Sequence, residues 1–165
     1  MKKIKAAFFD RDGTLIEDVS YLSRLDQIKL IPESIELCRN LQASGYTLFV
    51  VTNQSGIARG YFDEAFVQKT HQHLHKILYN EGITITGWYY CPHHPEYAIL
   101  EHYKKNCSCR KPEPGMLLQA SADFNVDLTQ SLMFGDKEGD LHAGIAAGCK
   151  SFDINEATQG LTHSS

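Results

Sequence analysis

Two carboxylates one residue apart, Asp10 and Asp12, have the spacing that most directly suggests chemistry in this chain. An apolar run over residues 6–9 precedes them and Gly13 follows, which is typical of a buried strand that carries acidic side chains to the end of a sheet. Because side chains alternate along an extended chain, both carboxylates are expected to point to the same side. Two such carboxylates repel each other, which predicts a cation between them or a raised pKa on one of them.

The same segment allows a second interpretation, a plain acidic turn or the start of a calcium-binding loop. A calcium loop needs further acidic ligands at alternating positions and a glutamate at its end. Here Gly13 is followed by Thr14, Leu15 and Ile16 instead. The segment alone leaves both interpretations open, so the rest of the chain must supply partners for the carboxylates.

Three more polar clusters stand at comparable positions. They are Thr52 with Asn53, Arg110 with Lys111, and Asp136 with Asp140. Ligands of open α/β sheets bind beyond the carboxyl ends of the strands, so we expect all four clusters to converge there. Carboxylates with a lysine and a hydroxyl form an oxygen-ligand site for Mg²⁺ beside a clamp for a phosphoryl group. The sequence has no G-x-x-x-x-G-K-[ST] run, which argues against a P-loop nucleotide hydrolase.

The elements that must position these clusters alternate between strand and helix. Strands are predicted at residues 6–9, 46–52, 85–90, 132–134 and 150–154, and helices at residues 33–43 and 63–80, from Pro114 onward, and before Gly148. This alternation predicts an α/β fold with a doubly wound, Rossmann-like parallel sheet and helices on both faces. We expect one domain over residues 1–155 and a polar tail over residues 156–165.

In two of these helices the sequence pattern predicts which side chains face the core and which face the solvent. In the second helix, His71, His73 and His75 are expected on the solvated surface, because i, i+2, i+4 spacing does not bring all three together. In the fourth helix, Leu141 and Ile145 are expected to face inward.

Cysteines and a histidine form a second chemical signal. Cys91 with His93, and Cys107 with Cys109, supply four soft or borderline ligands in two short pairs, which favours a tetrahedral structural zinc site on a loop. His94 could replace His93 as a ligand, and reduced thiols in the core are the competing interpretation. The other two cysteines lack such partners and are expected in the core.

The totals limit the function classes. The 165 residues suffice for one domain with a real core, and the formal net charge of -4 argues against a binder of nucleic acid or of anionic membranes. Any anionic ligand must therefore meet local positive charges. The N-terminus passes into the first strand without an apolar signal region, and no apolar run approaches the length of a membrane span. We therefore expect a cytoplasmic protein, and a monomer.

The order D-x-D-G-T, a strand ending in threonine, a lysine and then G-D-x-x-x-D resembles the haloacid dehalogenase-like phosphatase superfamily. The resemblance implies that Asp10 takes the phosphoryl group as an aspartyl-phosphate and that Asp12 acts as general acid and base. It also implies that Asp10, the backbone carbonyl of Asp12 and Asp136 hold Mg²⁺. Thr52 and Lys111 would hold phosphate oxygens.

Within that superfamily, residues 51–60, 90–95 and 109–118 resemble the zinc-loop group, whose members act on a heptose 1,7-bisphosphate or on histidinol phosphate. The similarity to the heptose bisphosphate phosphatases is the greater. It implies a phosphoric monoester hydrolase that removes the 7-phosphate from a small phosphorylated sugar. The side chains expected to bind this substrate are Asp18, Tyr21, Asn53, Gln54, Ser55 and Arg110.

Three questions remain open at this point. Arg110 could grip the second phosphate of a bisphosphate, or it could be a surface charge paired with a nearby acid. Histidinol phosphate remains the alternative substrate, and a non-catalytic zinc-loop binding module is the alternative from another class. After Ile154 the chain is short where the family leads us to expect a further helical segment.

Overall fold

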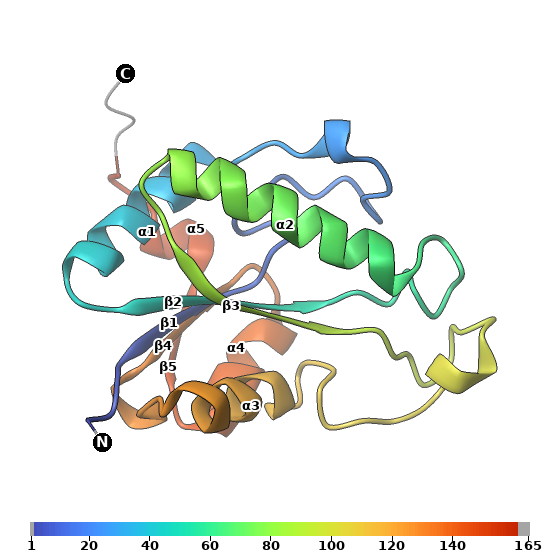
Figure 1. Cartoon of the computed structure of the whole chain (residues 1–165). Coiled ribbons are helices and arrows are strands. Elements are labelled where there is room, and N and C mark those ends of the chain that lie inside the picture. Colours follow the sequence, from blue (N-terminus) through green and yellow to red (C-terminus); the bar gives the residue numbers. More distant parts are fainter. Residues whose placement is uncertain (1, 162–165) are drawn as a thin grey trace.

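The computed structural model describes residues 2–161, which form a five-stranded, all-parallel sheet in the order β3-β2-β1-β4-β5 (Figure 1). The strands are β1 (Ala6–Phe9), β2 (Thr47–Asn53), β3 (Ile85–Cys91), β4 (Leu132–Gly135) and β5 (Lys150–Asp153). The α-helices are α1 (Pro32–Ala43), α2 (Glu64–Asn80), α3 (Gly115–Phe124), α4 (Glu138–Ala147) and α5 (Ile154–Ala157). The predicted fold class, a doubly wound parallel sheet, is confirmed.

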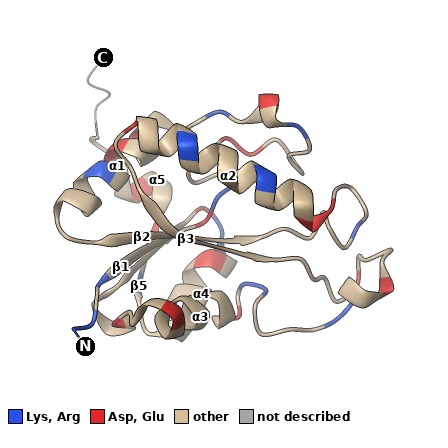
Figure 2. Cartoon of the chain, viewed as in Figure 1, with Lys and Arg blue, Asp and Glu red and all other residues tan. Residues whose placement is uncertain are grey.

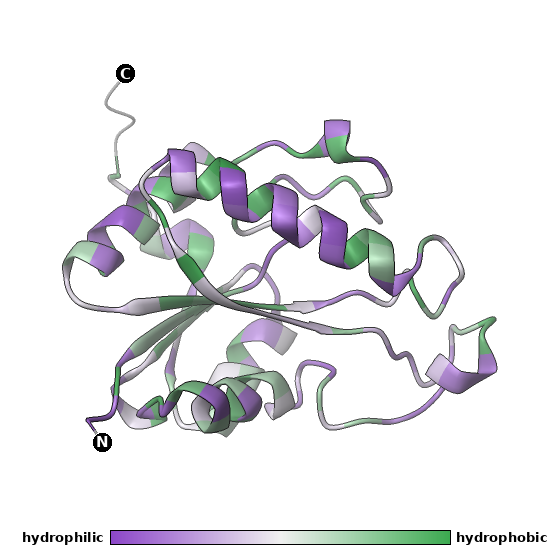
Figure 3. Ribbon diagram, viewed as in Figure 1, coloured by the Kyte–Doolittle hydropathy of each residue, from purple (hydrophilic) through white to green (hydrophobic). Residues whose placement is uncertain are grey.

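Helices cover both faces of the sheet. Helices α1, α2 and α5 lie on one face, and α3 and α4 lie on the other (Figure 1). The alternating side chains of β1 therefore enter two cores: Phe9 packs with Val50 beneath α1 and α2, whereas Phe8 packs with Phe49 against α3. Burial on both faces explains why β1 and β2 are continuous apolar runs, and Figure 3 shows a hydrophobic centre of the sheet.

The central position of β1 brings the polar clusters together. Strand β1 pairs with β2 on one side and with β4 on the other, so Phe9 lies level with Val50 and with Phe134. The amide of Asp10 still donates to the carbonyl of Phe134 at 3.0 Å. The residues that follow these three strands therefore begin side by side at one edge of the sheet, which is where ligands of such folds bind.

The expectation that all three α2 histidines are solvated is wrong for His71. Its side chain is buried, its ring stacks on Trp88 with centroids 4.8 Å apart, and its Nε2 lies 3.2 Å from Nη1 of Arg11. Burial and then the Arg11 charge lower the pKa of His71 to about 3, so the ring is neutral. His73 is exposed and His75 is half-buried. The position of His71 four residues after one buried side chain and three before another places it on the inner stripe of α2.

The expected inward position of Ile145 is also wrong, because the residue is 63% exposed. The face of α4 that packs on the sheet is formed by Ala143 and Gly144. A Cβ on Gly144 would collide with Met133 and with the Ser151 hydroxyl, so the helix lies too close to the sheet for a large side chain. The small residues set the contact and turn Ile145 to the solvent.

Helix α5 crosses the predicted boundary at residue 155. Ile154 is buried, and Ala157 packs partly against the core, so contact with the domain continues into the predicted tail. Residues 162–165 of that tail lie outside the described residues. In the part of the chain that the structure describes, no helix has the length and apolar character needed to cross a membrane.

Candidate active site

Lys111 lies at the centre of the polar clusters, at the carboxyl end of the sheet. Its Nζ donates to Oδ1 of Asp10 at 2.8 Å and to the carbonyl of Val51 at 2.9 Å, and it lies 2.6 Å from Oδ1 of Asp140. The lysine and both carboxylates are buried. Buried charges are tolerated when they are paired, so the three side chains fix one another in place.

The site holds more negative than positive charge. Strands β1 and β2 carry no charged residue, so the charges come from strand ends and loops (Figure 2). Burial opposes the charged form of Lys111, yet the Asp10 and Asp140 carboxylates outweigh it and raise the pKa, which keeps the ammonium protonated. Burial raises the pKa of Asp10 to about 7 despite Lys111, and the Asp140 charge adds to the rise. One ammonium facing two carboxylates favours a further cation.

Three carboxylates could hold that cation. One oxygen each from Asp10, Asp136 and Asp140 lies within 4.8 Å of the others. Oδ1 of Asp136 is buried and has no hydrogen-bond partner among the described residues, and burial followed by the Asp140 charge raises the pKa of Asp136. Such a set fits Mg²⁺, a hard cation that prefers oxygen ligands. The Asp12 carboxylate is not part of this cluster, and its backbone carbonyl as a magnesium ligand stays a prediction.

Gly13 allows the Asp136 carboxylate to approach the loop after β1. Its φ of 81° lies in the left-handed region, which side chains rarely adopt. A Cβ at this position would overlap the carboxylate of Asp136. Any other residue would therefore both strain the turn and displace a candidate metal ligand.

Hydrogen bonds hold Asp12 outside the carboxylate cluster. The chain already turns at Arg11, whose carbonyl accepts hydrogen bonds from three amides further along the loop, so the extended geometry expected for Asp10 and Asp12 ends before Asp12. Nε2 of Gln54 donates to Oδ2 of Asp12 and to Oγ1 of Thr52, both at 2.9 Å. Gln54 thus links the predicted acid–base carboxylate to the predicted phosphate-binding hydroxyl.

Sequence reasoning assigned no role to Arg11. Its side chain is buried, its Nε and Nη2 lie 3.1 to 3.2 Å from the Asp12 carboxylate, and its Nη1 contacts His71. A signal was present in the sequence, because a basic residue inside a segment that must be buried has to find a carboxylate nearby.

Asn53, a predicted substrate ligand, also fixes the backbone of Lys111. Its side-chain oxygen accepts from the Lys111 amide at 2.9 Å, and its Nδ2 donates to the Lys111 carbonyl at 3.2 Å. This two-way hydrogen bond ties the loop that carries the lysine to the end of β2.

A pocket of about 480 Å³ opens above Lys111 and Asp140. The residues predicted to bind substrate come from three separate stretches of the sequence, and all of them line this pocket. They are Asp18, Tyr21, Asn53, Gln54, Ser55 and Arg110. The structure therefore brings the predicted residues together, and their role as substrate ligands stays a prediction.

Two further cations, Arg59 and Lys137, line the same pocket, and neither was among the predicted substrate ligands. The guanidinium of Arg59 lies over the rings of Tyr21 and Tyr97, at 5.3 and 4.9 Å from the ring centroids. With Arg110 these side chains give the pocket three cations beyond Lys111. A chain of net negative charge thus presents the local positive charges that an anionic ligand requires.

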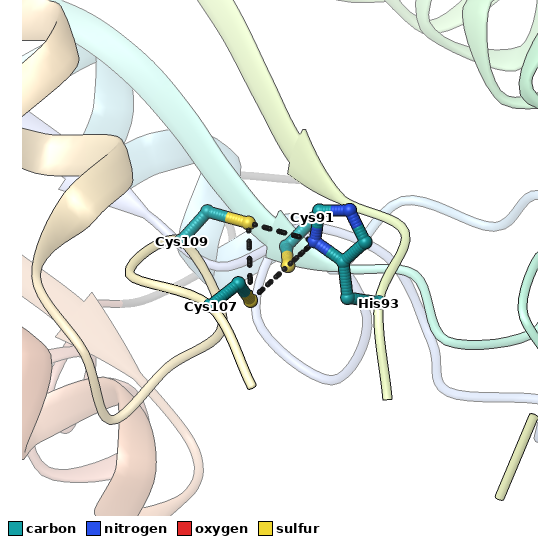
Figure 4. A group of neighbouring side chains, drawn as sticks. All are labelled: Cys91, His93, Cys107 and Cys109. Atoms are coloured by element: carbon teal, nitrogen blue, oxygen red, sulfur yellow. Dashed lines mark hydrogen bonds between the residues drawn. The ribbon is translucent and has the colours of Figure 1, made fainter. Parts of the chain in front are cut away.

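The four predicted zinc ligands, one at the end of β3 and three in the loop that follows, come together (Figure 4). The sulfurs of Cys91, Cys107 and Cys109 and a ring nitrogen of His93 all lie within 4.8 Å of one another, and the bonded pairs are 3.4 to 3.6 Å apart. Zn–S bonds of about 2.3 Å in a tetrahedron place two sulfurs about 3.8 Å apart. The side chains therefore stand near the spacing of a tetrahedral site, and the three cysteines are free thiols.

His93 belongs to this cluster and His94 does not. Nδ1 of His94 accepts from the amides of Glu96 and Tyr97 at 3.0 and 2.9 Å, so this ring closes a turn of the backbone. The alternative in which His94 replaces His93 is not supported by these contacts.

The zinc loop, residues 92–110, is anchored to the domain at several points. The carboxylate of Glu64 at the start of α2 accepts from the hydroxyls of Tyr90 and Tyr103, both at 2.6 Å. The amide of Ile99 donates to a carbonyl in the turn after β2 at 2.9 Å. The loop thus lies against the start of α2 and against the turn after β2, and residues of that turn line the pocket.

Comparison with known proteins identifies the family to which the chain belongs. The sequence profile of the haloacid dehalogenase-like hydrolases matches residues 17–148, which is more than half of the chain. The chain belongs to the haloacid dehalogenase-like hydrolases. The resemblance that the order of its motifs suggested is therefore confirmed.

Curated relatives of this haloacid dehalogenase-like chain are named D-glycero-beta-D-manno-heptose-1,7-bisphosphate 7-phosphatase. One from Haemophilus influenzae is 50% identical over 147 residues, which cover 88% of this chain and 78% of the relative. Another from Pasteurella multocida is 49% identical over 159 residues, which cover 96% of this chain and 85% of the relative. The chain is accordingly a phosphoric monoester hydrolase, and the prediction of an enzyme is confirmed.

A solved structure shares the fold of this haloacid dehalogenase-like chain. The D,D-heptose 1,7-bisphosphate phosphatase from B. bronchiseptica, solved with magnesium and phosphate, superposes with a TM-score of 0.79 at 30% identity. The match covers 97% of this chain and 88% of that one.

Proposed function

We propose that this enzyme is a Mg²⁺-dependent phosphatase that removes the 7-phosphate of a heptose 1,7-bisphosphate through an aspartyl-phosphate on Asp10. The observation that carries the proposal is the buried Lys111 ammonium, held between Asp10 and Asp140 at a pocket that also bears three further cations. A phosphate at Lys111 and a second phosphate further out would each meet positive charge. The names of the curated relatives point to the same reaction.

Asp10 is the nucleophile in this proposal. A carboxylate oxygen of Asp10 forms a bond to phosphorus while the bond between phosphorus and the oxygen on C7 of the sugar breaks. Asp12 gives its proton to that leaving oxygen, and Lys111 and Thr52 hold the phosphoryl oxygens.

Hydrolysis of the phosphoenzyme reverses the proton transfer. Asp12, now ionised, takes a proton from water as the water oxygen bonds to phosphorus, and the bond to Asp10 breaks to release inorganic phosphate. Mg²⁺ held by Asp10, Asp136 and the backbone carbonyl of Asp12 would offset the negative charge on the phosphoryl oxygens. Gln54, which contacts both Asp12 and Thr52, keeps the acid–base carboxylate beside the phosphoryl group.

Histidinol phosphate is the alternative substrate. It carries one phosphate and an imidazole, so the cations further out in the pocket would have no anion to bind. The carboxylate, hydroxyl and amide groups of the lining suit sugar hydroxyls, whereas an imidazole substrate needs fewer of them.

The deciding experiment measures inorganic phosphate released with Mg²⁺ present from heptose 1,7-bisphosphate and from histidinol phosphate. We expect a higher kcat/KM for the heptose bisphosphate, with the heptose 1-phosphate as the product identified by phosphorus NMR. A higher kcat/KM for histidinol phosphate would move the assignment to that substrate. Release of the 1-phosphate instead would overturn the proposed orientation in the pocket.

Arg110→Ala is predicted to weaken use of the bisphosphate while sparing a small monophosphate. The guanidinium can grip the second phosphate through two parallel hydrogen bonds, and loss of a charge-assisted contact of this kind raises KM by roughly 10- to 100-fold. The measurement is KM for heptose 1,7-bisphosphate and for a primary alkyl monophosphate, with wild type and variant side by side.

Two further variants sharpen this result. Arg110→Lys keeps the charge and loses the planar fork. Its KM for heptose 1,7-bisphosphate is therefore expected to lie between the values for wild type and for Arg110→Ala. Arg24→Ala removes an arginine whose side chain is 71% exposed and is expected to leave both substrates unchanged. Equal losses on both substrates in Arg110→Ala would indicate that Arg110 does not recognise the second phosphate.

We also propose that the enzyme acts in the cytoplasm as a single-domain monomer. Light scattering of the purified protein at working concentration tests this, and a dimer mass would contradict it.

A further inference from the structure

The Arg11 guanidinium lies in a position that stability alone does not explain. Its side chain is 2% exposed, and removing such a charge from water is costly unless its partners are well placed. Its carboxylate partner is Asp12, the neighbouring residue, which keeps 23% of its side chain exposed and lines the pocket. A buried guanidinium paired with a partly exposed carboxylate contributes little to folding compared with an apolar side chain of similar size.

The contacts between the two side chains fix the carboxylate in one orientation. Nε of Arg11 lies 3.2 Å from Oδ1 of Asp12, and Nη2 lies 3.1 Å from Oδ1 and 3.1 Å from Oδ2. Gln54 adds a third donor, on Oδ2 at 2.9 Å. Planar groups that meet through several hydrogen bonds have little freedom to rotate, so Asp12 is held toward the pocket.

His71 holds Arg11 from the other side. Its Nε2 lies 3.2 Å from Nη1 of Arg11, and because an arginine can only donate, Nε2 must be the acceptor and the imidazole neutral. The ring is itself fixed by stacking on Trp88 at 4.8 Å. Helix α2 and strand β3 thus set the place of the guanidinium, although neither element contributes a predicted catalytic residue.

We propose that Arg11, anchored by His71, is a positioning residue that aims the Asp12 carboxylate at the leaving oxygen. This inference rests on the proposed function, in which Asp12 protonates the leaving group. Disturbing the anchor should therefore slow the reaction in proportion to how much the leaving group needs a proton. An alkoxide leaving group needs one, whereas 4-nitrophenolate leaves without much help.

The test compares kcat/KM for a primary alkyl phosphate with kcat/KM for 4-nitrophenyl phosphate, because kcat/KM reports the steps up to the first phosphoryl transfer. The readout is the alkyl-to-aryl ratio, which is the first value divided by the second. Arg11→Met is expected to lower the value for the alkyl phosphate by about 100-fold or more, and the value for the aryl phosphate at least tenfold less. His71→Leu, which removes the acceptor, should change the ratio in the same direction. His71→Gln, which restores an acceptor oxygen, should return the alkyl-to-aryl ratio most of the way to its wild-type value.

His73→Leu is the matched control, because His73 is an exposed histidine of the same helix, and it should leave both substrates unchanged. If Arg11→Met does not fold, the His71 pair still decides the question. Equal losses on both substrates, or no rescue by glutamine, would overturn the positioning role while leaving the phosphatase proposal intact. A wild-type enzyme that releases phosphate from neither ester and not from heptose 1,7-bisphosphate would overturn both.

Discussion

Replacing Asp10 by Asn is expected to abolish turnover, with kcat lower by on the order of 10⁴-fold or more. An amide is a far poorer nucleophile than a carboxylate and cannot form the acyl phosphate. The fold should persist, because Lys111 still pairs with Asp140 at 2.6 Å and the site loses part of its excess negative charge. The measurement is phosphate release, together with trapping of labelled phosphate on the acid-quenched wild-type protein and not on the variant.

Asp26→Asn serves as the matched control for this variant. Asp26 pairs with Arg24 at the surface, and its side chain is 76% exposed, so its loss should leave kcat unchanged. The variant has to be purified free of wild-type enzyme. Near-normal activity of such an Asp10→Asn preparation would contradict the proposed mechanism.

Cys107→Ser is expected to lower both thermal stability and substrate affinity. The four-ligand cluster would bind one zinc per chain, and loss of a structural metal belongs to the large destabilisations, above about 4 kcal/mol. For a domain of this size that loss lowers Tm by roughly 8 to 16 °C. The zinc loop carries Arg110 and leads directly into Lys111, so loosening it should raise KM as well.

Metal analysis and calorimetry of the same samples check this expectation. Wild type prepared without chelators should hold one zinc per chain, and Cys107→Ser should hold less. Cys149→Ser is the control, because Cys149 is a buried thiol outside the cluster, and its zinc content should match wild type. Absence of zinc from the wild-type protein would contradict the structural role given to the cluster.

Much of this architecture follows from local rules, which is why the sequence predicts it. Burial on both faces makes β1 and β2 continuous apolar runs, and parallel pairing forces their carboxyl ends to one edge, so Asp10 and Thr52 converge with Lys111. The spacing of Cys91, His93 and the later cysteine pair reflects ligand chemistry that any zinc loop must meet.

Other features depend on contacts between distant segments, and no local pattern predicts those. The inner stripe of α2 turns His71 toward the core, but its partner there is Arg11, sixty residues earlier in the chain, and the helical periodicity does not indicate that pairing. Ile145 faces outward because Gly144 meets Met133 at close range, which sets the rotation of α4. The stacking of Arg59 between two tyrosines is likewise visible only once separate loops are placed side by side.

The hydrogen bonds between Asn53 and the backbone of Lys111 have a consequence for protein engineering. Lys111 directly follows the zinc loop in the sequence, but its position is set by a side chain of β2. Grafting residues 92–110 from a relative with a different pocket would therefore transfer new specificity only if the acceptor scaffold keeps an asparagine at the matching end of its strand. Residue 53 and the zinc loop therefore have to be treated as one unit. Libraries that diversify the loop should keep asparagine at position 53.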